Sequence, residues 1–156
     1  MASSPSTRTG NTGAGSGSTQ RTGYAIAKAL AKEGVDVMLN GRDTVKLSAA
    51  VASLRLEIPG AGVNGIPANF TDPAKVKRLC AELVDFDILI NNVGLFELKR
   101  FALISDDDWR MYLEVNVLSG VRLARHLMPA MLDRGWGRIL VVGGESAVNV
   151  PADMIH

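Results

Sequence analysis

Cysteine and aromatic residues are scarce in this sequence of 156 residues, which has one cysteine, Cys80, and only 5% aromatic residues. A single cysteine excludes an internal disulfide bond, so we interpret Cys80 as a buried apolar residue of a reducing compartment. The N-terminus lacks the apolar core of a signal peptide, and no segment approaches the roughly 20 apolar residues that span a bilayer. These absences predict a cytoplasmic protein.

An excess of charge of one sign is also lacking. The formal net charge is +1, and the Lys and Arg residues are spread along the chain. Such a distribution gives no generic attraction to nucleic acid or to an anionic membrane surface, and neither is predicted as a partner. No metal site is predicted.

What the sequence does contain is the composition of one globular domain, with 47% hydrophobic and 21% charged residues. Apolar residues recur at helical spacing or in short strand-like runs, in turn along the chain. Strands that alternate with helices of ten or more residues predict an α/β fold with a parallel sheet. The expected helices begin near residues 22, 44, 72 and 106, the last running to about 134, and the expected strands are 35–39, 63–67, 86–90 and 138–142.

A glycine-rich turn, Gly17-Ser18-Thr19-Gln20-Arg21-Thr22-Gly23, precedes the first predicted helix. Such a turn lets backbone N–H groups at a helix N-terminus approach a phosphate. A stretch rich in Gly and Ser is also typical of a linker, and residues 3–20 are mostly small and polar. About 20 residues beyond such a turn, an Arg can accept the 2′-phosphate of NADP. Arg42 stands there, although it could equally be a solvated loop residue.

Two asparagine signals follow. Asn91-Asn92-Val93-Gly94 ends a predicted buried strand, where ligands bind in open α/β sheets, although an ordinary Asn turn explains it too. Asn116 lies in an apolar stretch of the long predicted helix. A polar side chain in that position needs a partner, either structural or catalytic.

Together with residues 24–30, 114–117 and 137–139, these motifs resemble the classical short-chain dehydrogenase/reductase family. The resemblance implies a Rossmann-like doubly wound parallel sheet and NAD(P)H-dependent hydride transfer with an alcohol or carbonyl substrate. It implies that Asn116 is the catalytic Asn, and Arg42 favours NADP(H) over NAD(H). The cofactor site that it implies contains Gly17, Ser18, Thr19, Arg21, Thr22, Gly23, Arg42, Asn69, Asn91 and Gly94.

The sequence departs from the family pattern in several places. Arg21 occupies a glycine position of the turn, where its side chain should crowd the pyrophosphate unless the guanidinium pairs with phosphate. Asn11-Thr12-Gly13-Ala14-Gly15-Ser16 stands where the family has an apolar first strand. We therefore expect that strand to be weak, residues 1–16 to be disordered or degraded, and residues 17–156 to form a partial NAD(P)-binding domain without its C-terminal strands and helices.

The largest departure concerns catalysis. The Tyr-x-x-x-Lys motif that the resemblance implies after residue 156 is not in this sequence, and the position of the family's Ser falls on Gly144. Ser146 is the candidate to replace that Ser. The phenol and ammonium groups carry the acid–base step, so we expect an inactive member of the family. Two alternatives are a non-catalytic dinucleotide-binding module and a subunit-interaction module that associates through the helix 106–134.

Overall fold

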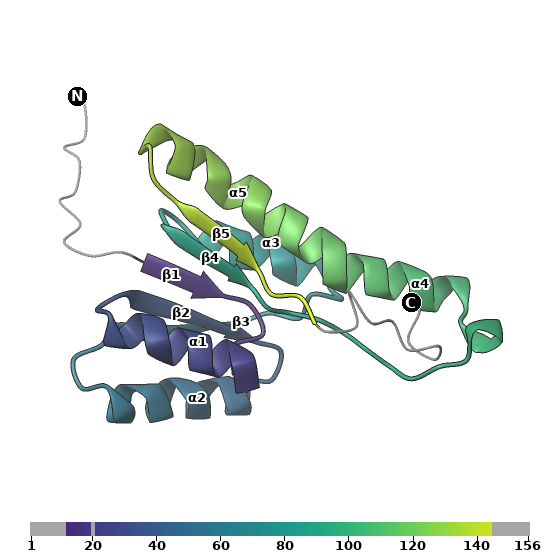
Figure 1. Cartoon of the computed structure of the whole chain (residues 1–156), viewed down its shortest axis with the longest axis horizontal. Helices are drawn as coiled ribbons and strands as arrows, with labels where there is room; N and C mark the ends of the chain where they lie inside the picture. The colour runs from purple at the N-terminus through teal and green to yellow at the C-terminus, as the bar shows by residue number, and fades with distance from the viewer. Residues whose placement is uncertain (1–11, 20, 145–156) are drawn as a thin grey trace.

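A five-stranded parallel sheet forms the centre of the computed structural model, which describes residues 12–19 and 21–144 (Figure 1). The strand order is β3-β2-β1-β4-β5. The order confirms the predicted Rossmann-like topology, in which the chain winds outward from a central first strand in both directions. The strands are β1 (Thr12–Gly15), β2 (Asp36–Gly41), β3 (Val63–Pro67), β4 (Ile88–Asn91) and β5 (Arg138–Val141).

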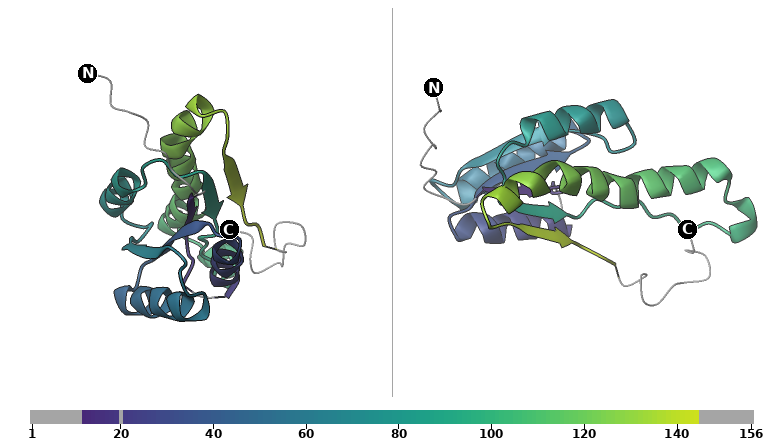
Figure 2. Two further views of the ribbon diagram at one scale, coloured as in Figure 1. Left: turned by 90° about the vertical axis from the view of Figure 1, so that its left-hand side faces the viewer. Right: turned by 90° about the horizontal axis from the view of Figure 1, so that it is seen from above.

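Helices cover both faces of this sheet (Figures 1 and 2). The first pair, α1 (Arg21–Lys32) and α2 (Thr44–Glu57), packs on β1, β2 and β3. The opposite face carries α3 (Pro73–Glu82) and a long helix. That long helix consists of α4 (Asp106–Leu113), a π-helical segment, η2 (Glu114–Leu118), and α5 (Ser119–Asp133); a 3-10 turn, η1 (Phe101–Leu103), precedes it.

Capping residues stand at the predicted helix starts near residues 44, 72 and 106. Asp43 caps α2 by accepting hydrogen bonds from two backbone N–H groups, and Asp72 caps α3, with Pro73 as the first helical residue. A reciprocal capping box between Ser105 and Asp108 begins α4. The long helix runs over the predicted range, but the sequence did not predict its π-helical segment.

The first strand corrects one expectation. Residues 12–15 form the central strand β1, whereas the sequence predicted disorder or degradation through residue 16. Backbone pairing explains the difference, because β1 is hydrogen-bonded to β2 on one side and to β4 on the other, and a ladder needs no large side chains. The Thr12 hydroxyl adds bonds of 3.1 Å to the Asp85 carbonyl and 3.2 Å to the Asp87 carboxylate.

As predicted, β1 is nevertheless a weak strand, because its small side chains contribute little to the hydrophobic core. Ala14 is its one member of the buried cluster under α3 and α5, and no β1 residue belongs to the described cluster under α1 and α2. A small cavity of about 10 Å³ borders Gly15 and Leu30 on the α1 side. A second cavity of about 10 Å³ borders Ala14 and Leu123 on the other side. Parallel central strands are normally packed by large side chains on both faces.

Across the described residues, no helix is both long and apolar enough to cross a membrane.

Candidate functional site

A cleft of about 720 Å³ opens at the carboxyl ends of β1, β2 and β4. This is the edge of an open α/β sheet at which ligands bind, beside the point where the strand order reverses. Its lining contains polar and apolar side chains. The polar and charged residues include Thr19, Asn40, Arg42, Asn69, Thr71, Asn92 and Glu97, and the apolar and aromatic residues include Phe70, Leu95, Phe96, Met111, Tyr112 and Val115.

Ser16 fixes the floor of this cleft. Its Oγ accepts hydrogen bonds from the backbone N–H groups of Asn92 at 3.0 Å and Val93 at 3.2 Å, and donates to Asn91 Oδ1 at 3.0 Å. The Asn92 side chain returns a bond of 3.1 Å to the Gly17 carbonyl. The turn after β1 and the loop after β4 are therefore held together as one unit. The sequence placed Ser16 only at the end of the degraded first-strand segment, and no local signal marks its bonds to residues 75 or more positions away.

Ser18 ties the same turn to β2. Its backbone N–H donates to the Asn40 carbonyl at 3.0 Å, and its Oγ accepts from the Asn40 N–H at 2.8 Å. The Asn40 side chain continues to the Ile66 carbonyl of β3 at 2.9 Å. Since Ser18 is only 1% exposed, its hydroxyl shapes the turn rather than the cleft surface.

The turn packs tightly under the start of α1. Gly17 has a φ of +59°, which favours glycine, and it lies against the backbone of Val93. A Cβ added to Gly23 would lie 2.5 Å from the Gly17 carbonyl oxygen and 2.7 Å from Asn92 Nδ2. Both glycines thus permit a close approach between helix, turn and loop. Thr22, beside Gly23 at the start of α1, is exposed.

Arg21 takes up a glycine-like conformation. It is the first residue of α1, it is exposed, and its φ is +50°. An L-residue in the left-handed region costs roughly 1–2 kcal/mol. Backbone strain is therefore located at Arg21, the residue that replaces a glycine of the family pattern.

Replacing Arg21 by Gly is expected to raise the free energy of unfolding by about 1 kcal/mol, because Gly adopts this backbone without strain. Urea denaturation measures the change. Arg21→Ala is the matched control, since it removes the charge and keeps the Cβ, and it should give no comparable gain. Equal gains from both variants would assign the effect to charge instead of backbone strain.

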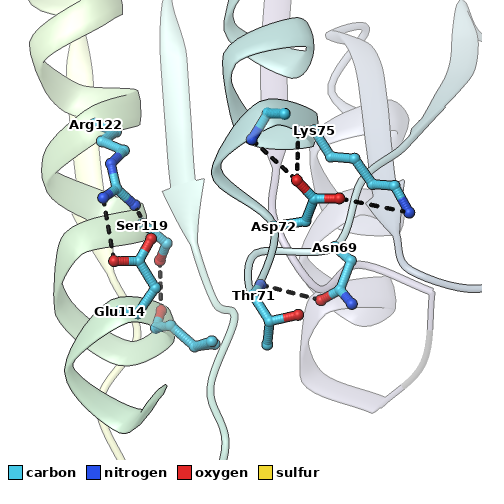
Figure 3. Close-up of polar contacts among 9 residues, drawn as sticks. Asn69, Thr71, Asp72, Lys75, Glu114, Ser119 and Arg122 are labelled. Carbon is cyan, nitrogen blue, oxygen red and sulfur yellow. Dashed lines mark hydrogen bonds and ion pairs between the residues drawn. The ribbon is translucent and has the colours of Figure 1, made fainter. Parts of the chain in front are cut away.

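The segments after β2 and β3 contribute another part of the cleft lining. Arg42 directly follows β2 and is exposed. Asp43, the nearest carboxylate, is engaged as the cap of α2, with bonds of 2.9 and 3.0 Å from Val45 and Lys46. Asn69 is half-buried, and its Oδ1 accepts from the Thr71 N–H at 3.1 Å (Figure 3).

The structure separates the roles of the paired asparagines. Asn91 is 4% exposed and lies beneath the cleft wall, between Ser16 and the long helix. A Cβ on Gly120 would come within 2.5 Å of Asn91 Nδ2, so the helix packs directly on this amide. Asn92 lines the cleft instead, as does Gly94. The sequence singled out Asn91 and Gly94, and Asn92 carried the same signal.

Asn116 holds the loop after β4 against the long helix. Its Oδ1 accepts from the Leu95 N–H at 2.7 Å, and its Nδ2 donates to the Leu95 carbonyl at 3.0 Å. It lies in η2, which is flanked by an ion pair between Glu114 and Arg122 (Figure 3). π-Helical turns are frequent at functional sites. The partner that the sequence required for Asn116 is therefore a backbone segment.

The two tyrosines of the sequence are the candidates for the phenol of the family's acid–base pair. Tyr112 lines the cleft, and removal of its phenol from water raises its pKa, which makes it a poorer acid. Tyr24 and Lys28 have the Tyr-x-x-x-Lys spacing, but both bind Glu57 of α2, with 2.7 Å between the Tyr24 and Glu57 oxygens. They serve as a clamp between α1 and α2 outside the cleft.

The remaining candidates lie at the C-terminal end. Gly144 is exposed, and Ser146 falls outside the described residues. Among residues 12–19 and 21–144, no three His, Cys, Asp or Glu side chains gather in a way that could hold a metal ion.

Residues 12–155 match the protein family described as short chain dehydrogenase. The chain is 39% identical over 143 residues to the uncharacterized oxidoreductase YvrD of Bacillus subtilis (strain 168), covering 89% of this chain and 53% of the relative. It is 34% identical over 131 residues to the 3-oxoacyl-[acyl-carrier-protein] reductase FabG of Escherichia coli (strain K12), covering 81% and 52%.

Solved structures agree. L-sorbose reductase from Gluconobacter frateurii, complexed with NADPH and L-sorbose, superposes with a TM-score of 0.87 at 31% identity, covering 94% of this chain and 57% of that one. The chain spans about half the length of the curated relatives it matches.

Proposed function

The chain belongs to the short-chain dehydrogenase/reductase family of oxidoreductases, and we propose that its cleft binds NADP(H) in preference to NAD(H). The observation that carries this proposal is that Gly17 and Thr19 of the glycine turn line the same cleft as Arg42. The L-sorbose reductase that shares the fold was solved with NADPH.

The residues present fit a dinucleotide. The first turn of α1 holds no acidic side chain, so its N-terminal N–H groups and partial positive charge are available to a pyrophosphate. Gly17 and Gly23 bring the backbone close to where it would lie, and Thr19 and Asn92 line the same wall. Asn69 and Thr71 line the cleft near Arg42, where an adenosine would bind. When bound, the nicotinamide supplies or accepts a hydride.

Selectivity for the 2′-phosphate rests on Arg42. No carboxylate stands at the end of β2 to bind a ribose diol, because the Asp43 side chain is committed to capping α2. An exposed guanidinium that lines the cleft is suited to a phosphate, which it can bind through two N–H groups.

Arg42→Ala is therefore expected to weaken NADPH binding about tenfold, the equivalent of one charge-assisted hydrogen bond, and to leave NADH binding within twofold. Titration of nicotinamide fluorescence measures both constants. Arg78→Ala, which removes an exposed Arg from α3 away from the cleft, should change neither constant. Equal losses for the two nucleotides would contradict the assignment of Arg42.

The chemistry of the family is hydride transfer between the nicotinamide and a small alcohol or carbonyl compound. For these 156 residues alone we propose nucleotide binding without turnover. Tyr24 and Lys28, which have the spacing of the family's acid–base pair, bind Glu57 outside the cleft, and burial of Tyr112 in the cleft raises its pKa. Asn116, the proposed catalytic Asn, is bonded to Leu95 in the loop after β4. Ser146 remains the candidate for the family's catalytic Ser.

A second proposal concerns self-association through the helix 106–134. Apolar side chains at intervals of four, Trp109, Leu113, Val117 and Val121, are each more than 40% exposed along this helix. Such a stripe favours a second helix. We expect dimers in size-exclusion chromatography with light scattering, and Val121→Lys should shift them to monomers. A wild-type monomer at all concentrations would contradict this proposal.

A further inference from the structure

The loop after β4, which runs to the start of α4, forms one wall of the cleft without much apolar packing of its own (Figure 1). Its residues Leu95, Phe96 and Glu97 line the cleft. Four large apolar side chains of this stretch are mostly exposed: Phe96 at 75%, Leu98 at 66%, Phe101 at 64% and Leu103 at 65%. Apolar burial stabilises a segment in proportion to the area removed from water. The position of this loop therefore depends on its polar contacts.

Two sets of polar contacts fix the loop to the long helix. The first is the pair of hydrogen bonds between the Asn116 side chain and the backbone of Leu95. The second is an ion pair of 2.6 Å between Lys99 Nζ and Asp108 Oδ2, which we call the loop anchor. The two side chains are 28% and 17% exposed, so water screens this pair less than it screens a pair on the surface. Phe96 lies between the two contacts.

Asp108 is itself held in place at the start of α4. The oxygen that binds Lys99 also accepts from the Ser105 N–H and the Ser105 hydroxyl, each at 2.7 Å. The Lys99 ammonium, followed by these Ser105 donors, holds the pKa of Asp108 well below its usual range. The carboxylate is therefore charged at neutral pH, and it offers the loop a fixed anion.

The loop anchor lies next to the cleft. Tyr112, one turn of α4 after Asp108, lines the cleft. Burial, and then the carboxylates of Glu97 and Asp108, raise the pKa of Tyr112, so both carboxylates lie near its phenol. Arg42 follows β2 and the loop follows β4, on opposite sides of β1. A dinucleotide that crosses this point with its 2′-phosphate on Arg42 would place its nicotinamide half beside the loop.

We propose that Lys99 is a positioning residue for the nicotinamide half of the cofactor, because the loop anchor holds Phe96 and Glu97 in the cleft wall. Lys99 does not line the cleft, so it acts through the loop. A loop that is already ordered in its bound position gives tighter binding, since less freedom is lost when the ligand arrives. The ligand in this inference rests on the proposed nucleotide function, whereas the loop anchor itself requires no nucleotide.

Two ligands separate this role from a general loss of structure: NADPH, and 2′-phospho-ADP-ribose, which lacks the nicotinamide. In isothermal titration calorimetry, Lys99→Gln should weaken NADPH binding about tenfold and change 2′-phospho-ADP-ribose binding by less than about twofold. Lys99→Arg keeps the ion pair and should bind NADPH like the wild type. Arg42→Ala should weaken both ligands. Equal losses of the two ligands in Lys99→Gln, or an unchanged NADPH affinity, would overturn the proposal.

A measurement without nucleotide tests the loop anchor directly. Chymotrypsin cleaves after aromatic and leucine side chains such as Phe96 and Leu98, and Lys99→Gln should speed cleavage of this loop about fivefold. Arg110→Gln is the matched control, because it removes a cation of α4 whose ion pairs to Asp106 and Asp107 are on the surface. It should change neither cleavage nor NADPH affinity.

Unchanged cleavage in Lys99→Gln would overturn the loop anchor, whatever the nucleotide affinities are. A wild-type chain that bound neither nucleotide would contradict the nucleotide proposal and, with it, the role of Lys99 toward the nicotinamide. The cleavage rates decide the loop anchor separately, so the two failures are distinguishable.

Discussion

Replacing Gly23 by Ala should lower the free energy of unfolding by about 3 kcal/mol and abolish NADPH binding. The added Cβ would lie 2.5 Å from the Gly17 carbonyl oxygen, 2.7 Å from Asn92 Nδ2 and 2.9 Å from Ser18 Cα. Two of these atoms belong to the backbone of the turn, so no side-chain rotation relieves the overlap. Helix α1 would have to move away from the turn, and the phosphate site would open.

Gly13→Ala provides the matched control, because it makes the same change in the same region of the fold. There the added Cβ would lie 3.4 Å from Val35 Cγ1 and 3.5 Å from Leu30 Cδ1, which is ordinary contact. Ala also loses less conformational freedom than Gly in a strand, so a gain of about 1 kcal/mol is expected. Urea denaturation of both variants checks the opposite signs. A Gly23→Ala protein as stable as the wild type would refute the close packing of α1 on the turn.

Much of the fold follows from local sequence signals. The predicted helix starts near residues 44, 72 and 106 are confirmed, and the oxygen side chains of Asp43, Asp72 and Ser105 cap these helices. Strand β1 was the exception. The segment Thr12–Gly15 has no apolar run to identify it, and its order comes from ladders to β2 and β4 that only the tertiary fold provides. Local propensity does not encode pairing between distant segments.

The candidate site also contains residues that motifs could place and residues whose roles depend on the tertiary fold. The glycine turn, Arg42 and Gly94 could be placed from motifs, because spacing along the chain fixes them at one end of the sheet. The sequence could not assign Asn91 to the buried side and Asn92 to the cleft, because the two residues carry the same signal. It also could not identify Leu95 as the partner of Asn116, which depends on the path of a loop.

Ser16 makes contacts that the sequence could not predict, and we expect its replacement to have a large effect on stability. Ser16→Ala removes the oxygen that accepts from two N–H groups, of Asn92 and Val93, and donates to Asn91 Oδ1. Ser16 is 3% exposed, so these groups lie in or beside the protein interior, where water replaces the hydroxyl poorly. Each buried polar group left without a partner costs about 1–3 kcal/mol, and we expect a total loss of about 3 kcal/mol. Urea denaturation measures it, and NADPH affinity should fall in parallel as the floor of the cleft loosens.

Ser16→Thr separates the hydroxyl from the space around it. Threonine keeps the Oγ, and Ser16 borders both small cavities beside β1, so a methyl group has room on either side. The stability of this variant should lie within about 1 kcal/mol of the wild type. If Ser16→Thr were as damaging as Ser16→Ala, the cause would be packing rather than hydrogen bonding. If both variants were neutral, the bonds between the β1 turn and the β4 loop would not be what holds the cleft in shape.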